Sequence, residues 1–177
     1  MISVGIITVS DRGSRGERED QGGPLIKQIV TDKGWEVKAS AIIPDEQKII
    51  EAKLIEFADV VGADIIFTTG GTGFSQRDVT PEATLAVVQR LAPGLAEAMR
   101  QESLKITPMA MLSRAAAGIR GKSIIINLPG SPKAVKECLE VVLPALGHGV
   151  EILKGVAGDC AETLKHPHSH PHHHEHN

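Results

Sequence analysis

Two glycine-rich segments of this 177-residue chain have the composition of phosphate-binding loops. The first, Gly70-Gly71-Thr72-Gly73, has three glycines within four residues, which allows positive φ angles and turns backbone N–H groups inward. The second, Pro129-Gly130-Ser131-Pro132, leads into a predicted helix N-terminus, which is a natural anion site. Either segment alone is equally compatible with an ordinary turn before a capped helix. Their occurrence together favours a phosphate site, while the absence of Walker A and GxGxxG patterns argues against common kinases and dehydrogenases.

Acidic residues close to these segments indicate a cation, because a carboxylate alone repels phosphate. Asp78 precedes Thr80, which is predicted to cap the next helix, so Asp78 is available to hold Mg²⁺ against nucleotide phosphates. Asp45 follows a predicted strand and precedes a predicted helix, and its spacing alone favours a plain N-cap. Ser10 and Asp11 end the first apolar run and form a third candidate loop.

Basic residues near the loops are a weaker signal. Arg77, Arg114 and Lys133 are possible phosphate ligands, although isolated basic residues are more often ordinary surface.

The elements that must position these loops alternate between short β-branched runs and longer amphipathic stretches. Strands are predicted over residues 3–9, 35–43, 64–69 and 123–127, with a loop over 12–22. Helices are predicted over residues 23–33, 45–61, from Thr80 onward, 95–104, 108–117, 133–142 and 144–154. This alternation predicts an α/β domain with a parallel, doubly wound sheet, and ligands of such sheets bind at the carboxyl ends of the strands.

Composition narrows the function classes. The net charge of −3 and the aromatic content of 2% argue against a non-specific nucleic-acid binder. Cys138 and Cys160 have no metal-ligand spacing and are expected to be free thiols of a reducing compartment. Neither a signal peptide nor a membrane span is apparent, so we expect a cytoplasmic protein without a membrane partner.

The last residues differ from the domain, which is expected to span residues 1–163. Residues 164–177 are predicted to form a disordered tail, since the segment HPHSHPHHHEHN carries seven of the eight histidines and has no core-forming residues. A purification tag and a native tail both explain this composition, and its irregular pattern favours the native tail. Loose binding of a transition metal is then a hypothesis, which identical nickel titrations with and without the tail would reject. Its ligands would be drawn from His168, His170, His172, His173 and His174.

Five motifs in order give the chain a specific resemblance. They are Thr8-Val9-Ser10-Asp11-Arg12, Thr69-Gly70-Gly71-Thr72-Gly73, Arg77-Asp78-Val79-Thr80-Pro81-Glu82-Ala83, Leu112-Ser113-Arg114-Ala115 and Asn127-Leu128-Pro129-Gly130-Ser131-Pro132. From about residue 2 to 153 the chain resembles the molybdopterin adenylyltransferases, a MogA-like family related to MoaB and to the G domain of gephyrin.

The resemblance implies a three-layer α/β/α fold, a homotrimer and a reaction in molybdenum cofactor biosynthesis. In that reaction the terminal phosphate of molybdopterin is joined to AMP from ATP in the presence of Mg²⁺, and pyrophosphate is released. The adenylylated product then passes to a protein that inserts molybdate or tungstate. The alternative is a molybdopterin-binding protein of the same fold without catalysis, which would need neither ATP nor the acids.

The resemblance also implies roles for individual residues. Asp45 and Asp78 are the two essential acids and position Mg²⁺ and the triphosphate, which replaces the capping interpretation of Asp45. The loop 70–73 cradles nucleotide phosphates, and Glu82 contacts the same ligand. The expected contacts to the pterin or its phosphate come from Ser113, Gly130 and Ser131. The resemblance adds Ser10, Asp11, Arg114 and Pro129 to the predicted ligand-binding residues.

Overall fold

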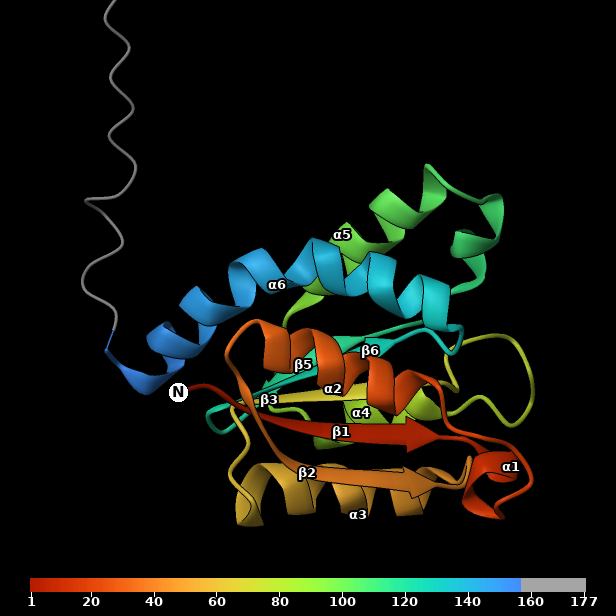
Figure 1. Cartoon of the computed structure of the whole chain (residues 1–177), viewed down its shortest axis with the longest axis horizontal. Helices are drawn as coiled ribbons and strands as arrows, with labels where there is room; N and C mark the ends of the chain where they lie inside the picture. The colour runs from red at the N-terminus through yellow and green to blue at the C-terminus, as the bar shows by residue number, and fades with distance from the viewer. Residues whose placement is uncertain (157–177) are drawn as a thin grey trace, which may run out of the picture.

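The structure is a computed structural model that describes residues 1–156, so the predicted histidine tail and Cys160 lie outside the described residues. Figure 1 shows a central sheet with helices on both faces. The strands are β1 (Ser3–Val9), β2 (Glu36–Ile43), β3 (Ile65–Thr69), β4 (Arg90–Leu91), β5 (Ala117–Arg120) and β6 (Ser123–Leu128). The helices are α1 (Asp11–Ser14), α2 (Gly22–Asp32), α3 (Gln47–Ile55), the π-helical turn η1 (Glu56–Val60), α4 (Thr80–Val87), α5 (Pro93–Leu104), the 3₁₀ turn η2 (Pro108–Leu112) and α6 (Pro132–Lys154).

The six-stranded sheet has the order β2-β1-β3-β6-β5-β4. Strands β2, β1, β3 and β6 are parallel, as predicted, and their carboxyl ends therefore meet at one edge. Strands β5 and β4 are antiparallel to their neighbours. The sequence analysis missed both of these strands because β4 has only two residues and β5 is a short run that includes a glycine. The fold class, a mostly parallel α/β/α architecture, is confirmed.

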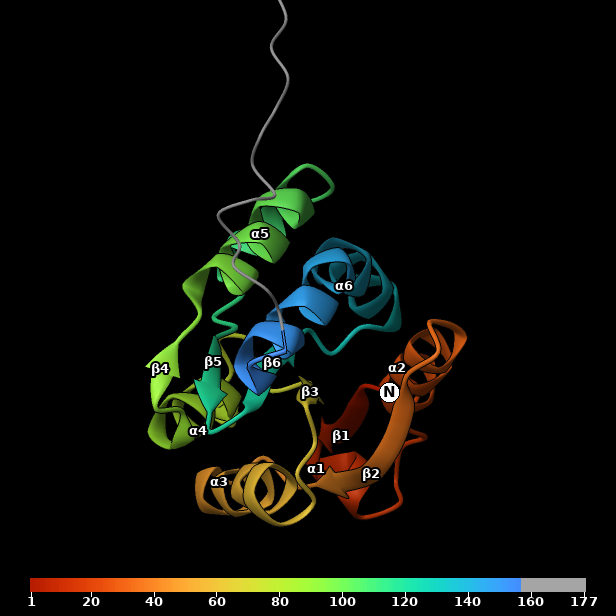
Figure 2. The ribbon, with the colours of Figure 1, turned by 90° about the vertical axis from the view of Figure 1, so that its left-hand side faces the viewer.

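Alternate residues of the parallel strands enter two separate apolar layers. Ile6 and Phe67 pack on one side, where α2, α5 and α6 cover the sheet. Ile7 and Ile66 pack on the other side, beneath α3 and α4. Figure 2 shows these helices on opposite faces of the sheet. Burial on both faces explains why β1, β3 and β6 are nearly continuous apolar runs in the sequence.

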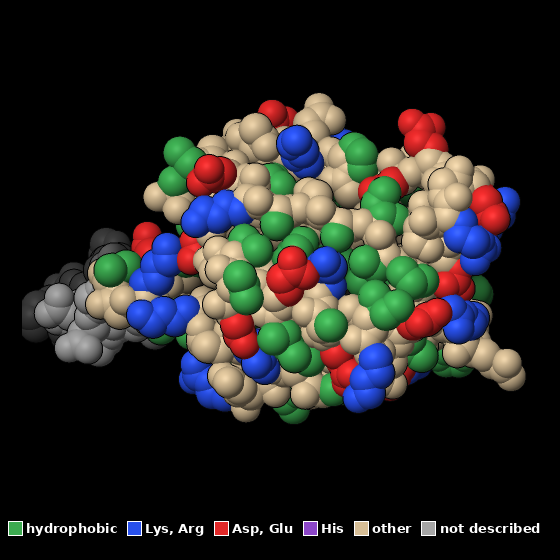
Figure 3. Space-filling model, turned by 90° about the horizontal axis from the view of Figure 1, so that it is seen from below, with side chains coloured by type: hydrophobic (Ala, Val, Ile, Leu, Met, Phe, Trp, Pro, Cys, Tyr) green, Lys and Arg blue, Asp and Glu red, His purple; other side chains and the backbone are tan. Residues whose placement is uncertain are grey.

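The face that carries α3 exposes charged and apolar side chains together (Figure 3). Lys48 pairs with Glu51 at 3.0 Å and Lys53 pairs with Glu56 at 2.7 Å, in each case three residues along the chain. Figure 3 shows this side of the molecule, with acidic and basic side chains interspersed among apolar ones. Each pair has at least one well-exposed partner and contributes at most about 1 kcal/mol to stability.

Two helix predictions were wrong at the C-terminal half of the chain. The predicted helix 108–117 is instead η2 followed by β5, because the sheet takes up residues 117–120 as a strand. The two predicted helices on either side of Pro144 are one continuous helix, α6. Proline removes one backbone hydrogen bond, but the buried stripe that includes Val142, Leu143 and Leu146 continues past it and holds both halves on the sheet.

Candidate phosphate-binding site

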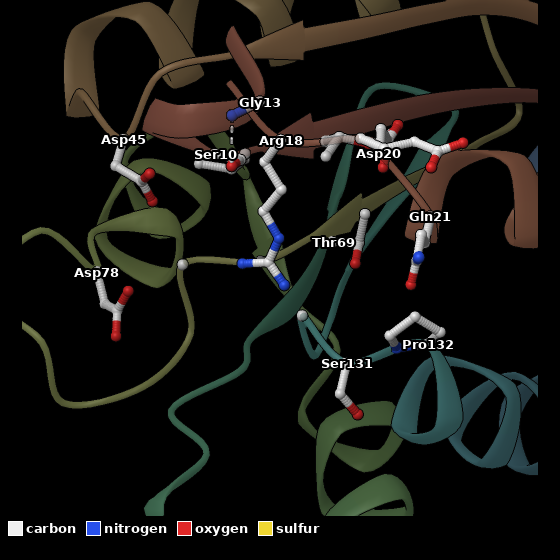
Figure 4. Close-up of a pocket in the computed structure, with 17 residues that line it drawn as sticks. Ser10, Gly13, Arg18, Asp20, Gln21, Asp45, Thr69, Asp78, Ser131 and Pro132 are labelled. Atoms are coloured by element: carbon white, nitrogen blue, oxygen red, sulfur yellow. Dashed lines mark hydrogen bonds between the residues drawn. The ribbon is translucent and has the colours of Figure 1, made fainter. Parts of the chain in front are cut away.

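A cavity of about 480 Å³ lies at the carboxyl ends of β1 and β3, where the N-terminal ends of α2 and α6 also meet (Figure 4). Its position is the one that the parallel sheet predicts for a ligand. Its walls come from six segments of the chain: Thr8, Val9, Ser10 and Gly13; Arg18, Glu19, Asp20, Gln21 and Gly22; Asp45; Thr69, Gly70 and Gly71; Asp78; and Gly130, Ser131 and Pro132.

The first glycine turn follows β3 and needs glycine for two reasons. Gly70 and Gly71 have φ angles of +97° and +69°, which side chains with a Cβ rarely adopt. A Cβ on Gly70 would collide with the Val9 carbonyl oxygen, and one on Gly71 would collide with Thr80 Oγ1. The predicted capping role of Thr80 is wrong, since its hydroxyl donates to the Gly70 carbonyl at 3.0 Å and thereby fixes the turn.

The second glycine turn lies beside the first. Thr69 Oγ1 donates to the Pro129 carbonyl at 2.7 Å, and the Cβ position of Gly130 lies 3.6 Å from Gly70 Cα. Ser131 Oγ accepts from Ala134 N at 3.2 Å and so caps α6, as predicted. Both glycine turns therefore reach the same cavity, which the N-terminus of the 23-residue helix α6 also lines.

Asp45 and Asp11 are joined although they are 34 residues apart. Asp11 N donates to Asp45 Oδ2 at 2.8 Å, and Asp45 N donates to Asp11 Oδ1 at 3.0 Å. The capping interpretation of Asp45 is thus wrong, because α3 begins without a side-chain cap. Arg77 donates to both Asp11 carboxylate oxygens, at 3.0 and 2.8 Å. Asp45 lines the cavity, and Asp11 supports it from behind.

Ser10, at the carboxyl end of β1, both caps a helix and lines the cavity. Its side chain accepts from Gly13 N at 3.0 Å and caps α1, so the predicted loop 12–22 begins with a helical turn instead. The same residue lines the cavity.

The electrostatics of Asp45 fit a cation nearby. Burial raises the pKa of its carboxyl, and the charges of Asp11 and Asp78 raise it further, against the lowering effects of the Asp11 hydrogen bond and of Arg77. A divalent ion between Asp45 and Asp78 would relieve this repulsion. Within residues 1–156 no cluster of three or more His, Cys, Asp or Glu forms a metal site. Mg²⁺ is commonly held by one or two carboxylates together with phosphate and water, so the pair suits that ion.

The loop that carries Asp78 is braced from outside the cavity by Arg114. The guanidinium donates to the carbonyls of Gly73 at 2.8 Å and Asp78 at 2.7 Å. It also pairs with the Glu82 carboxylate at 2.7 Å. Both Arg114 and Glu82, predicted as ligand contacts, face each other rather than the cavity, so the structure gives them a role in positioning the loop. Asp78 Oδ2 itself accepts from Ser75 N at 3.0 Å.

The remaining predicted residues lie in a second cavity of about 290 Å³. Thr72, Gly73 and Pro129 line it from the same two turns, and Ser113 closes it from the segment after η2. Most of its other walls are apolar side chains of α5, η2 and α6: Ala96, Met99, Met109, Ala110, Leu112, Ala134 and Cys138. Burial raises the pKa of the Cys138 thiol, which therefore behaves as a small apolar group. The glycine turns thus separate a polar cavity from a largely apolar one.

Sequence reasoning missed several residues of the polar cavity, notably those from the segment 18–22. Asp20 accepts from Thr8 Oγ1 at 2.9 Å, which fastens the segment to β1, and from Gly23 N at 3.1 Å in the first turn of α2, whose N-cap residue is Gln21. The spacing of Asp20 and Gly23 was a detectable signal of a helix start. Arg18 gave no such signal, because its position depends on how the segment folds over the cavity.

Fold and site together define an α/β protein with a polar, glycine-lined cavity at the carboxyl edge of its parallel strands. Residues 5–148 match the family described as probable molybdopterin binding domain, and the chain belongs to this family. The family assignment from the sequence motifs is thereby confirmed.

Named relatives cover most of the chain. Molybdopterin adenylyltransferase of Helicobacter pylori strain J99 is 46% identical over 157 residues, which are 87% of this chain and 89% of that protein. The Escherichia coli K12 protein of the same name is 45% identical over 152 residues, or 84% of this chain and 77% of that protein. The crystal structure of the molybdopterin biosynthesis enzyme MoaB from Thermus thermophilus superposes with a TM-score of 0.83 at 50% identity, covering 88% of this chain and 98% of that one.

Proposed function

We propose that this protein is a molybdopterin adenylyltransferase, a nucleotidyltransferase of molybdenum cofactor biosynthesis. It transfers AMP from ATP to the phosphate of molybdopterin and releases pyrophosphate. One observation carries the proposal: two carboxylates, Asp45 and Asp78, line the same cavity as both glycine turns. The names of the H. pylori and E. coli relatives support the same reaction.

The chemistry requires two anionic groups to approach each other, so the site must neutralise charge and hold both groups in line. Backbone N–H groups of the Gly70–Gly71 turn and the α6 N-terminus bind phosphate oxygens. Asp45 and Asp78 hold Mg²⁺, which when bound neutralises the triphosphate. No side chain needs to form a covalent intermediate, in keeping with phosphoryl-group chemistry that depends mainly on positioning.

The apolar cavity behind the turns suits a flat heterocycle. Thr72, Gly73 and Pro129 of the two glycine turns line it, so a ligand can place its ring there and its phosphate in the polar cavity. Ser113, at the rim, is placed to hydrogen-bond the ring. We assign this cavity to the pterin.

The alternative is a molybdopterin-binding protein without catalysis. Such a protein does not need two carboxylates that repel each other in its binding site. The raised pKa of Asp45, which reflects this repulsion in part, therefore favours the enzyme. The decisive assay mixes purified protein with molybdopterin, Mg²⁺ and ATP and measures AMP incorporation and pyrophosphate. Binding of molybdopterin without AMP transfer would establish the alternative instead.

Substitution of Asp78 tests the cation role directly. Asp78→Asn keeps the hydrogen bond from Ser75 N but removes the charge. We expect at least ~100-fold lower turnover, about 2.7 kcal/mol of barrier, with the thermal unfolding temperature preserved. Full activity of this variant would remove the Mg²⁺ role assigned to Asp78.

Several properties of the assembly belong to the same proposal. From the family resemblance we expect a homotrimer in the cytoplasm and transfer of the product to a protein that inserts molybdate or tungstate. Within residues 1–156 no helix has the length and apolar composition needed to cross a membrane. The metal-binding role of the tail remains a prediction.

A further inference from the structure

Arg18 is the only lysine or arginine among the residues that line the polar cavity, where four acidic residues accompany it. Figure 4 shows its guanidinium directed into the middle of the cavity, with Asp45 and Asp78 on one side and Thr69 and Ser131 on the other. Within the described part of the chain, its guanidinium makes no hydrogen bond or ion pair with any other residue.

Three other arginines near the cavity are already engaged. Arg77 is held by Asp11, Arg114 by Glu82, and Arg15 by Glu17. Among the residues that line the cavity, Arg18 is therefore the basic side chain available to a ligand.

The charge balance of the cavity indicates a role for Arg18 in ligand binding. A triphosphate and a phosphate monoester that enter a predominantly acidic cavity are repelled, and a cation on the Asp45 and Asp78 side compensates only that side. The guanidinium lies between the acidic side and the side formed by Thr69 and Ser131. Its planar fork can bind two phosphate oxygens at once, as guanidinium groups commonly do.

We infer that Arg18 is a substrate-binding residue that contacts the reacting phosphates and stabilises the charge on the departing pyrophosphate. In the transfer, an oxygen of the molybdopterin phosphate bonds to the α-phosphorus of ATP. The bond from that phosphorus to the bridging oxygen breaks, and pyrophosphate leaves with the electron pair. Arg18 keeps its proton throughout and contributes charge and hydrogen bonds only. This inference rests on the proposed function for the identity of the phosphates.

Inorganic pyrophosphate provides a test that does not depend on turnover. Calorimetry with Mg²⁺ and pyrophosphate compares full-length wild type with Arg18→Gln, Arg18→Lys and the control Arg15→Gln, which removes the same charge from the same segment outside the cavity. We expect Arg18→Gln to weaken binding at least ~10-fold, or about 1.4 kcal/mol. Arg18→Lys should fall in between, because it keeps the charge and loses the fork. Arg15→Gln should stay within about twofold, as expected for an exposed pair.

Turnover measurements distinguish a failure of this inference from a failure of the proposed function. We expect Arg18→Gln to lower kcat/KM for ATP about 10- to 100-fold relative to Arg15→Gln, which reaches the lower end of the roughly 100- to 1000-fold loss seen when one donor to a reacting group is removed. Equal pyrophosphate affinities of Arg18→Gln and Arg15→Gln would overturn the assignment of Arg18, whatever their activities. A wild type that binds pyrophosphate through Arg18 but forms no adenylylated molybdopterin would leave the assignment standing and refute the proposed function.

Discussion

Replacement of Arg114 by glutamine should damage activity far more than its loss of stability explains. The guanidinium donates to the carbonyls of Gly73 and Asp78, which lie on the loop that carries the Asp78 carboxylate. The side chains of Arg114 and Glu82 are 35% and 40% exposed. Because solvent screens their ion pair, it contributes only about 0–1 kcal/mol to stability. The two carbonyl bonds add about 1 kcal/mol each.

These contributions predict destabilisation of about 2–3 kcal/mol, and a Tm lower by roughly 4–12 °C for a chain of this size. Without the guanidinium, the loop is free to move Asp78 away from the cavity. A displacement near 1 Å in a positioned group costs about 100-fold in rate, and we expect a loss of that order in kcat.

Arg120 offers a matched control at another part of the sheet. It pairs with Asp59 through two hydrogen bonds of 3.1 and 2.8 Å and donates to the Val87 carbonyl at 2.8 Å. Arg120→Gln should therefore lower Tm by a similar amount while kcat stays within about threefold of wild type. Calorimetric unfolding and the adenylylation assay measure both variants. The reasoning is refuted if Arg114→Gln and Arg120→Gln lose equal activity at equal stability.

Two further substitutions test the acid and the glycine turn. Asp45→Asn should abolish turnover yet raise Tm at pH 7, because burial and two neighbouring carboxylates raise the pKa of Asp45. Because the pKa of Asp45 is higher in the folded than in the unfolded state, the native wild type holds the proton more tightly, and its stability falls as pH rises. The Tm advantage of Asp45→Asn over wild type should therefore shrink as pH is lowered toward the ordinary pKa of 3.8. A lower Tm for the variant than for wild type at pH 7 would contradict this. Gly71→Ala should lose about 1–3 kcal/mol in urea unfolding from its φ of +69° and the collision with Thr80. Gly16 has a φ of +71° and open space around it, so Gly16→Ala should lose less unfolding free energy than Gly71→Ala. Equal losses of unfolding free energy would show that the collision with Thr80 is unimportant.

Strands β1, β3 and β6 could be predicted from sequence because burial on both faces leaves a local signature. The edge strand β2 left a different one, since its residues alternate between more and less exposed positions. The capping of α6 by Ser131 was likewise predictable, since a cap depends on residues within one helical turn. The short strands β4 and β5 could not be predicted in the same way, because so few residues carry no periodicity and only pairing with β6 makes them strands.

The sequence by itself determined the family, the sheet edge that carries the site and the glycine turns that face it. Tertiary structure alone decided that Asp45 binds the backbone of Asp11 instead of capping α3, and that Arg114 braces the Asp78 loop. It also brought Arg18 over the cavity. The physical reason is that turns, caps and periodicity arise between near neighbours in the chain, whereas these contacts join segments that meet only after the crossovers have packed the helices on the sheet.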